Sequence, residues 1–203
     1  MKLNKIEFLL MNNPVRSFIQ EEYELHNLRG MTSLKKIDSA LEIGCGNGKG
    51  TKLLKKHFSP NRITAIDLDE KMIEIAEKNN RDKNISFHIM DAAKLELPDN
   101  YFDVVFDFGI IHHIPNWQEC LCELKRVLKD GGELILEELS KESFSDVPGK
   151  IWKAILKHPY EKMFSQSEFV SYLKEIGFSI NHFKEFYPLK LIKFFSLSAK
   201  LLV

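Results

Sequence analysis

The feature that most constrains this chain is the glycine-rich stretch 41–51 (LEIGCGNGKGT), with glycines at positions 44, 46, 48 and 50. A short apolar run leads into the glycines, and a helical pattern with Leu53, Leu54 and Phe58 on one side follows them. This order predicts a strand, a glycine loop and a helix. Glycine lets a ligand approach the main chain closely, and the N-terminus of the following helix attracts negative charge. The loop is therefore expected to hold a polar small molecule against bare backbone.

The spacing of the glycines argues against two familiar nucleotide motifs. The dinucleotide fingerprint needs a third glycine three places after the second, and counted from Gly46 that place is Lys49. A P-loop needs Ser or Thr after its Gly-Lys pair, and this chain has Gly50 there. The pattern that remains is an acidic residue, Glu42, between two apolar residues, followed by G-x-G-x-G.

A second acidic residue follows the next predicted strand. Residues 62–66 form a β-branched run that ends in Asp67, about 20 residues beyond the glycine loop. A carboxylate at the end of a second parallel strand can accept hydrogen bonds from both hydroxyls of a ribose. Asp69 is better placed to cap the helix that follows. Asp67 is therefore the strongest single candidate for binding a nucleoside.

Four segments, in order, resemble the signatures of the class I S-adenosylmethionine-dependent methyltransferases. They are 41–51, 65–72 (AIDLDEKM), 101–115 (YFDVVFDFGIIHHIP) and 124–134 (LKRVLKDGGEL). The resemblance covers about residues 38–140 and is closest to the methyltransferase type 11 and UbiE-like group that acts on small molecules. It implies an α/β fold with a doubly wound, seven-stranded Rossmann-like sheet in three αβα layers. The sheet would be mostly parallel, with an antiparallel last strand.

The same resemblance implies S-adenosyl-L-methionine as cofactor and S-adenosyl-L-homocysteine as product. The residues that would bind the cofactor are Glu42, Gly44, Cys45 and Gly46 around the loop, Asp67 at the ribose, Leu68 and Met72 against the adenine, Asp91 and Ala92 at its amino group and ring, and Asp107 and Phe108 near the methionine part. Asp107 departs from the family pattern, in which small neutral residues are commoner. Asp107 could instead bind a cationic acceptor, or it could bind the ammonium group of the cofactor.

The histidine pair His112-His113 follows the predicted fourth strand. Neighbouring histidines are expected to point apart, and no matching ligand cluster completes a metal site, so no metal is expected. One histidine is expected to pack under the loop. The other, for which His112 is the candidate, could face the acceptor as a general base.

Composition limits the partners and the compartment. Lys and Arg together number 29 and balance 29 Asp and Glu, which argues against a dedicated nucleic-acid binder. The three cysteines, at 45, 120 and 122, suggest no disulfide framework and favour a reducing cytoplasm. The apolar stretch 8–11 is too short for a signal peptide, and no run reaches the roughly 20 apolar residues of a membrane span.

Domain organisation is predicted as a helical cap over residues 1–37 and a methyltransferase domain over 38–203. Residues 140–163 are expected to form a lid or acceptor insertion, in which Trp152, Tyr160 and Phe164 line the acceptor pocket or form the lid's own core. The tail 189–203 is either an amphipathic helix on a membrane or a final strand paired with 178–187. Its alternation from residue 195 onward favours the strand.

The predicted function is transfer of a methyl group from the cofactor to an acceptor by in-line displacement. The charge balance and the aromatic insertion favour a small molecule as acceptor. The alternative is a cofactor-binding module without catalysis, which would serve as a regulator or partner. A Rossmann dehydrogenase is a third reading, disfavoured by Lys49.

Overall fold

The structure is a computed structural model that describes residues 28, 30–156, 159–190 and 192–202. Most of the helical cap predicted for residues 1–37 lies outside the described residues. The part that is described, residues 30–37, is turn and irregular backbone that leads into the first strand.

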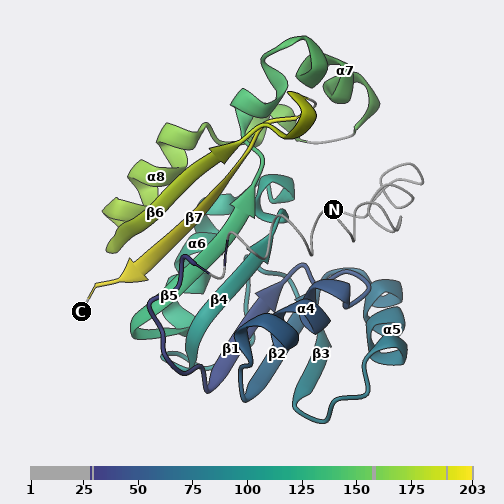
Figure 1. The fold of residues 1–203 in the computed structure, drawn as a ribbon, viewed down its shortest axis with the longest axis vertical. Helices are drawn as coiled ribbons and strands as arrows, with labels where there is room; N and C mark the ends of the chain where they lie inside the picture. Colours follow the sequence, from purple (N-terminus) through teal and green to yellow (C-terminus); the bar gives the residue numbers. More distant parts are fainter. Residues whose placement is uncertain (1–27, 29, 157–158, 191, 203) are drawn as a thin grey trace.

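The described residues form one seven-stranded sheet with the order β3-β2-β1-β4-β5-β7-β6 (Figure 1). The strands are β1 (Ser39–Ile43), β2 (Arg62–Asp67), β3 (Ile85–Ile89), β4 (Phe102–Phe108), β5 (Leu128–Glu138), β6 (Phe178–Phe186) and β7 (Phe194–Leu201). The pairs from β3 to β5 are parallel, and β7 runs antiparallel to both β5 and β6. The fold class predicted from the sequence is confirmed.

Helices cover both faces of this sheet. They are α4 (Lys49–Phe58), α5 (Glu70–Asn79), α6 (Trp117–Val127), α7 (Val147–Ile155) and α8 (Gln166–Glu175), with short 3-10 turns η2 (Ile111–His113), η3 (Lys141–Phe144), η4 (Tyr160–Lys162) and η5 (Pro188–Lys190). The apolar cluster that includes Leu54 of α4 and Ile73 of α5 lies on one face. The cluster that includes Leu121 of α6 and Phe169 of α8 lies on the other. Helix α7 lies away from the sheet, near the tip of the β6–β7 hairpin (Figure 1).

Burial on both faces explains the continuous apolar runs in the central strands. Ala40 and Val104 pair across β1 and β4 and belong to one cluster, whereas the next pair, Leu41 and Val105, belongs to the other. All four side chains are fully buried. Burial of each large apolar side chain contributes about 1.5–3 kcal/mol to the free energy of folding. The centre of the sheet therefore contributes much of the stability of the fold.

In open α/β sheets a ligand crevice lies where the strand order reverses, and here that place is between β1 and β4. The chain moves outward from β1 to β2 and β3, then crosses back to β4 on the other side of β1. The loops after β1 and β4 therefore leave in opposite directions, which is the topological switch point where ligands bind in open α/β sheets. The glycine loop and the histidine pair are the two segments that meet there.

The tail forms a strand, as its alternation predicted. β7 lies between β5 and β6, with Leu197 paired to Leu136 on one side and to Phe183 on the other. Phe195, Leu197 and Ala199 are fully buried. Among the described helices, none is both long and apolar enough to cross a membrane.

Candidate functional site

The glycine loop after β1 contains three glycines with positive φ, at 64° for Gly44, 52° for Gly46 and 77° for Gly48. A Cβ added to Gly44 would lie 2.6 Å from the Cβ of Ile110, and one added to Gly48 would meet the Asn80 side chain. At Gly46, nothing lies within 4 Å of the added atom. Gly44 and Gly48 are therefore required for packing, whereas Gly46 leaves open space beside the backbone.

Asp67, at the end of β2, holds this open part of the loop. Its Oδ2 accepts a hydrogen bond from the backbone N–H of Gly46 at 2.9 Å, and its Oδ1 accepts one from Asp69 N at 2.8 Å. Partial burial raises the pKa of Asp67, and the two backbone donors oppose that shift. A carboxylate has about four acceptor positions, so hydroxyl groups of a ligand can still bind here.

Two apolar side chains lie exposed beside Asp67. Leu68 is 49% exposed and Ile89, which pairs with Asp67 across β2 and β3, is 53% exposed. Asp91 is exposed just after β3, where its Oδ1 accepts from Ala93 N at 2.9 Å. Met72 and Ala92, also predicted at the adenine, are buried. The end of β2 and β3 therefore combines uncovered apolar surface with carboxylates.

Glu42 and Cys45 lie beneath the loop. Glu42 is buried, and its Oε2 accepts a hydrogen bond from Thr51 Oγ1 of α4 at 2.5 Å. Burial raises the pKa of Glu42 to about 8. The Cys45 thiol is also buried, and burial raises its pKa, which keeps it neutral. In this arrangement Glu42 ties the start of the loop to the helix after it, and Cys45 contributes apolar packing.

The turn after β4 lies on the other side of the switch point. Asp107 is fully buried, and its Oδ1 accepts from Ile110 N at 2.9 Å. Phe108 is half-buried and stacks on Phe106 at 6.4 Å between ring centroids. His112 is 4% exposed, and its Nδ1 lies 2.5 Å from Oε2 of Glu138 at the end of β5.

The two histidines do not point apart as the sequence suggested. Their ring centroids are 4.1 Å apart with an angle of 36° between the planes, because η2 is a tight 3-10 turn and not an extended strand or α-helix. His113 is 9% exposed, so both rings are covered. No group of three or more His, Cys, Asp or Glu side chains within the described part of the chain is arranged to hold a metal ion.

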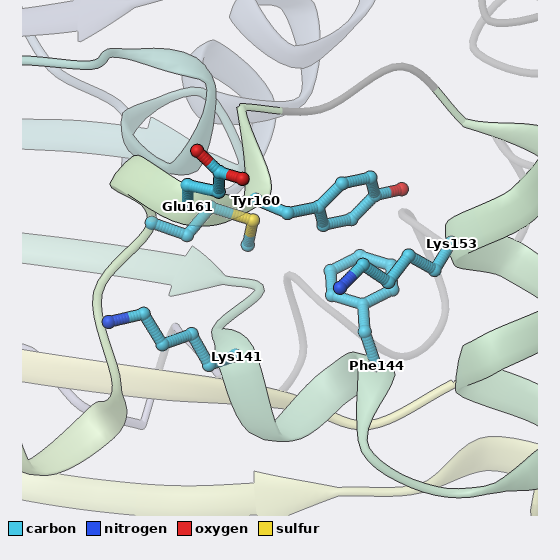
Figure 2. Close-up of a pocket in the computed structure, with 6 residues that line it drawn as sticks. Lys141, Phe144, Lys153, Tyr160 and Glu161 are labelled. Atoms are coloured by element: carbon cyan, nitrogen blue, oxygen red, sulfur yellow. The ribbon is translucent and has the colours of Figure 1, made fainter.

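A hollow lies in the segment between β5 and α8. It is a pocket of about 260 Å³ lined by Lys141, Phe144, Lys153, Tyr160, Glu161 and Met163. Figure 2 shows the rings of Phe144 and Tyr160 together beside Lys153, with Lys141 apart from them. Phe164 is not part of this pocket. It packs in the main core against Trp117, Phe169 and Phe195, because the chain turns back to the sheet there.

Comparison with known proteins agrees with this geometry. Residues 41–136 match the family model described as a methyltransferase domain. By this match, just under half of the chain is similar to a methyltransferase domain of the S-adenosylmethionine-dependent class. The part of the domain that matches the model runs from the first strand to the fifth, and so includes the glycine loop, Asp67 and the turn after β4.

The match to named relatives covers only part of the length of each relative. Malonyl-[acyl-carrier protein] O-methyltransferase of Bacillus cereus is 34% identical over 114 residues, which are 56% of this chain and 42% of that protein. Demethylmenaquinone methyltransferase of Staphylococcus aureus is 33% identical over 132 residues, 64% of this chain and 54% of that protein. The chain thus spans about half the length of these relatives.

Solved structures share the fold of the methyltransferase domain. A SAM-dependent methyltransferase from Aquifex aeolicus superposes with a TM-score of 0.76 at 23% identity, covering 99% of this chain and all of the other. The match extends beyond the five parallel strands to the β6–β7 hairpin, so the whole described sheet follows the architecture of that protein.

The residues of the methyltransferase domain fit S-adenosylmethionine, the cofactor of the family. The open backbone at Gly46 accepts close approach of a ligand, Asp67 retains acceptor positions for ribose hydroxyls, and the exposed Leu68 offers an apolar face to a base. Gly44, Gly46, Asp67 and Leu68 converge at the switch point. Asp107 and His112 are buried beside it. The cofactor-binding and catalytic roles of all the predicted site residues stay predictions.

Sequence reasoning missed two residues of this site, Ile110 and Glu138. Ile110 covers Gly44, and Glu138 contacts the turn that carries Ile110. The available signal was that Glu138 directly follows the fifth strand predicted from the sequence, residues 133–137, since the carboxyl ends of parallel strands meet at the crevice.

Proposed function

We propose that this domain transfers a methyl group from S-adenosyl-L-methionine to a small-molecule acceptor by in-line displacement. The observation that carries this proposal is the open backbone at Gly46 held by Asp67 at the switch point of the sheet. That combination supports binding of a nucleoside with its ribose at the carboxylate. The match of residues 41–136 to the methyltransferase family supports the reaction class.

In this proposal the chain mainly binds and aligns the reactants. The sulfonium of the bound cofactor supplies an already activated methyl group. Asp67 accepts hydrogen bonds from the ribose, and Leu68 and Met72 pack against the adenine. Asp91 and the backbone of Ala92 form hydrogen bonds with the edge of the adenine ring. Gly44 and Gly46 let the rest of the cofactor approach the main chain. Alignment of this kind can supply most of the acceleration in a displacement reaction.

The acceptor is proposed to bind in the insertion 140–163. Support comes from the pocket near Phe144 and Tyr160, which begins only a few residues after the end of β5 at the crevice (Figure 2). Two of the relatives are named for malonyl-[acyl-carrier protein] and demethylmenaquinone, neither of which is a nucleic acid. The balanced charge of the chain points the same way.

The alternative function, a cofactor-binding module without catalysis, is favoured by one observation. His112, the proposed general base, is 4% exposed and engaged with Glu138. Methyl transfer does not always need a base. The burial of His112 therefore weakens its assignment as the base more than it weakens the assignment of the reaction. We keep His112 as the candidate base.

The test is transfer of label from methyl-labelled S-adenosylmethionine to a metabolite extract. We expect label in the small-molecule fraction, and suppression of that transfer by excess S-adenosylhomocysteine. Binding of the cofactor with no transfer to any fraction would favour the non-catalytic module. Label that appears only in polymeric RNA, DNA or protein would contradict the proposed acceptor class.

We also propose that the protein works in the reducing cytoplasm. Cys45 and Cys120 are buried and free, and Cys122 is exposed and free, a state that suits a reducing compartment. A fluorescent fusion that locates outside the cytoplasm would contradict this.

A further inference from the structure

Glu138, the last residue of β5, is a buried carboxylate that the proposed function does not yet use. Its side chain is fully buried, and β5 is the third strand from the β6 edge of the sheet. A buried carboxylate is costly unless hydrogen-bond donors surround it. The identity of its donors therefore indicates what the residue is for.

Most of these donors come from the turn after β4. Oε1 of Glu138 accepts from Ile111 N at 2.5 Å and from His112 N at 3.3 Å. Oε2 lies 2.5 Å from His112 Nδ1 and accepts from Leu139 N at 3.0 Å. Three of the four contacts thus hold η2, which is 26–27 residues away in the sequence.

Asp107 shows which of the two buried carboxyls carries the charge. Its Oδ1 accepts a hydrogen bond from Ile110 N, and no N–H group among the described residues donates to its Oδ2. Burial and the charge of Glu138 raise the pKa of Asp107 well above its ordinary value, which favours its neutral form. Glu138, with four N–H groups around it, is the better-stabilised anion. An ionised carboxylate only accepts, so the His112 ring must carry its proton on Nδ1.

The turn held by Glu138 is the one that covers the glycine loop. Ile110 precedes η2 directly, and its side chain fills the space over Gly44. We propose that Glu138 is a positioning residue for the reaction, which holds Ile110 over the glycine loop and fixes the ring of His112. This inference rests on the proposed function, because positioning presupposes a reaction at this crevice.

The test compares Glu138→Gln with Glu137→Gln, a matched loss of a buried carboxylate one residue earlier in β5. Glutamine has the same shape but replaces one acceptor oxygen by an N–H donor, which would meet the N–H donors of the turn. Nitrogen-15 NMR of histidine-labelled protein, assigned with His112→Asn, reports the ring. We expect a proton on Nδ1 of His112 in the wild type and in Glu137→Gln, and loss of that state in Glu138→Gln. An unchanged His112 signal in Glu138→Gln would overturn the proposal.

Turnover gives the second readout, measured as label transfer from methyl-labelled S-adenosylmethionine to a metabolite extract. We expect Glu138→Gln to slow transfer about tenfold or more, because a small displacement of the residues that align the reactants slows the reaction. The Kd of the cofactor should stay within about threefold of the wild-type value. In the His112→Asn background the same change should slow transfer less than about twofold, because non-additivity marks residues that act together. An equal loss in both backgrounds would overturn the proposal.

The pH profile gives the third readout. Burial raises the pKa of Glu138 to about 7. The titratable groups around it are Asp107 on β4, His112 on η2 and Cys120 on α6, and the ring of His113 packs against that of His112. Transfer should rise with pH through neutrality in the wild type, and this limb should be absent in Glu138→Gln and present in Glu138→Asp. Failure of both variants to fold would assign Glu138 to the fold alone and overturn the proposal. A wild type without any transfer would refute the proposed function, and the NMR result would still decide the role of Glu138.

Discussion

Ile110 occupies the space over Gly44, so that a Cβ at position 44 would lie 2.6 Å from the Cβ of Ile110. The two residues belong to loops that leave the sheet on opposite sides of its switch point, one after β1 and one after β4. Their contact ties together the two segments from which the site is built. A change at either residue should therefore affect both loops.

Gly44→Ala should destabilise the protein. The added methyl group would overlap Ile110, and alanine at a φ of 64° is strained. We expect a loss of about 2–3 kcal/mol in the free energy of unfolding, measured by urea denaturation. Ile110→Ala should recover part of this loss in the double variant, and purely additive effects would contradict the contact.

Gly46→Ala should act on binding more than on stability. Nothing lies within 4 Å of the added atom, so only the strain of a φ of 52° remains, about 1–2 kcal/mol. The methyl group would stand where the cofactor is proposed to approach the backbone. We expect a folded variant with at least about tenfold weaker cofactor binding, a loss of about 1.4 kcal/mol. A Gly46→Ala variant that binds like the wild type would show that the ligand lies elsewhere.

Glu42→Gln should change how stability depends on pH. Burial raises the pKa of Glu42 to about 8 in the folded protein, above its ordinary value of 4.5. A carboxyl with a raised pKa stabilises the fold at low pH and loses that contribution as pH rises through 4.5 to 8. The Tm of Glu42→Gln relative to wild type should therefore rise by roughly several degrees from pH 5 to pH 9. Parallel Tm curves for the two proteins would contradict the raised pKa.

Removal of the chain after Tyr187 should prevent folding. This truncation deletes β7, which pairs with both β5 and β6, and leaves two unpaired strand edges. We expect aggregation by size-exclusion chromatography, whereas removal of residues 202–203, which lie beyond β7, should leave a folded protein. A truncated form that stays folded, combined with a full-length protein that pellets with anionic liposomes, would instead favour a membrane role for the tail.

Local sequence signals were sufficient to predict most of the fold. Apolar runs, the glycine loop and capping residues such as Asp69 and Ser165 depend on neighbours close in sequence. The capping box at the start of α8 joins Ser165 and Glu168, which are only three places apart. The position of β7 was predictable because its alternating apolar residues needed a partner strand.

The site was predictable only in part, because its contacts join distant segments. Asp67 and Gly46 were each singled out, but the hydrogen bond between them depends on how β1 and β2 align. Glu138 gave little signal, since a glutamate at the end of a strand is usually solvated. Its role emerges only when β5 pairs with β4 and brings the turn that carries His112 against it.

The most direct test of the central claim is calorimetric titration of S-adenosylmethionine into wild type, Asp67→Ala and Asp69→Asn. Asp69→Asn removes the same charge two residues away and keeps a side chain that caps α5 well. We predict that wild type and Asp69→Asn bind alike and that Asp67→Ala binds at least about tenfold more weakly, a loss of about 1.4 kcal/mol. No binding by wild type, or undiminished binding by a folded Asp67→Ala variant, would contradict the claim that the cofactor lies at the glycine loop beside Asp67.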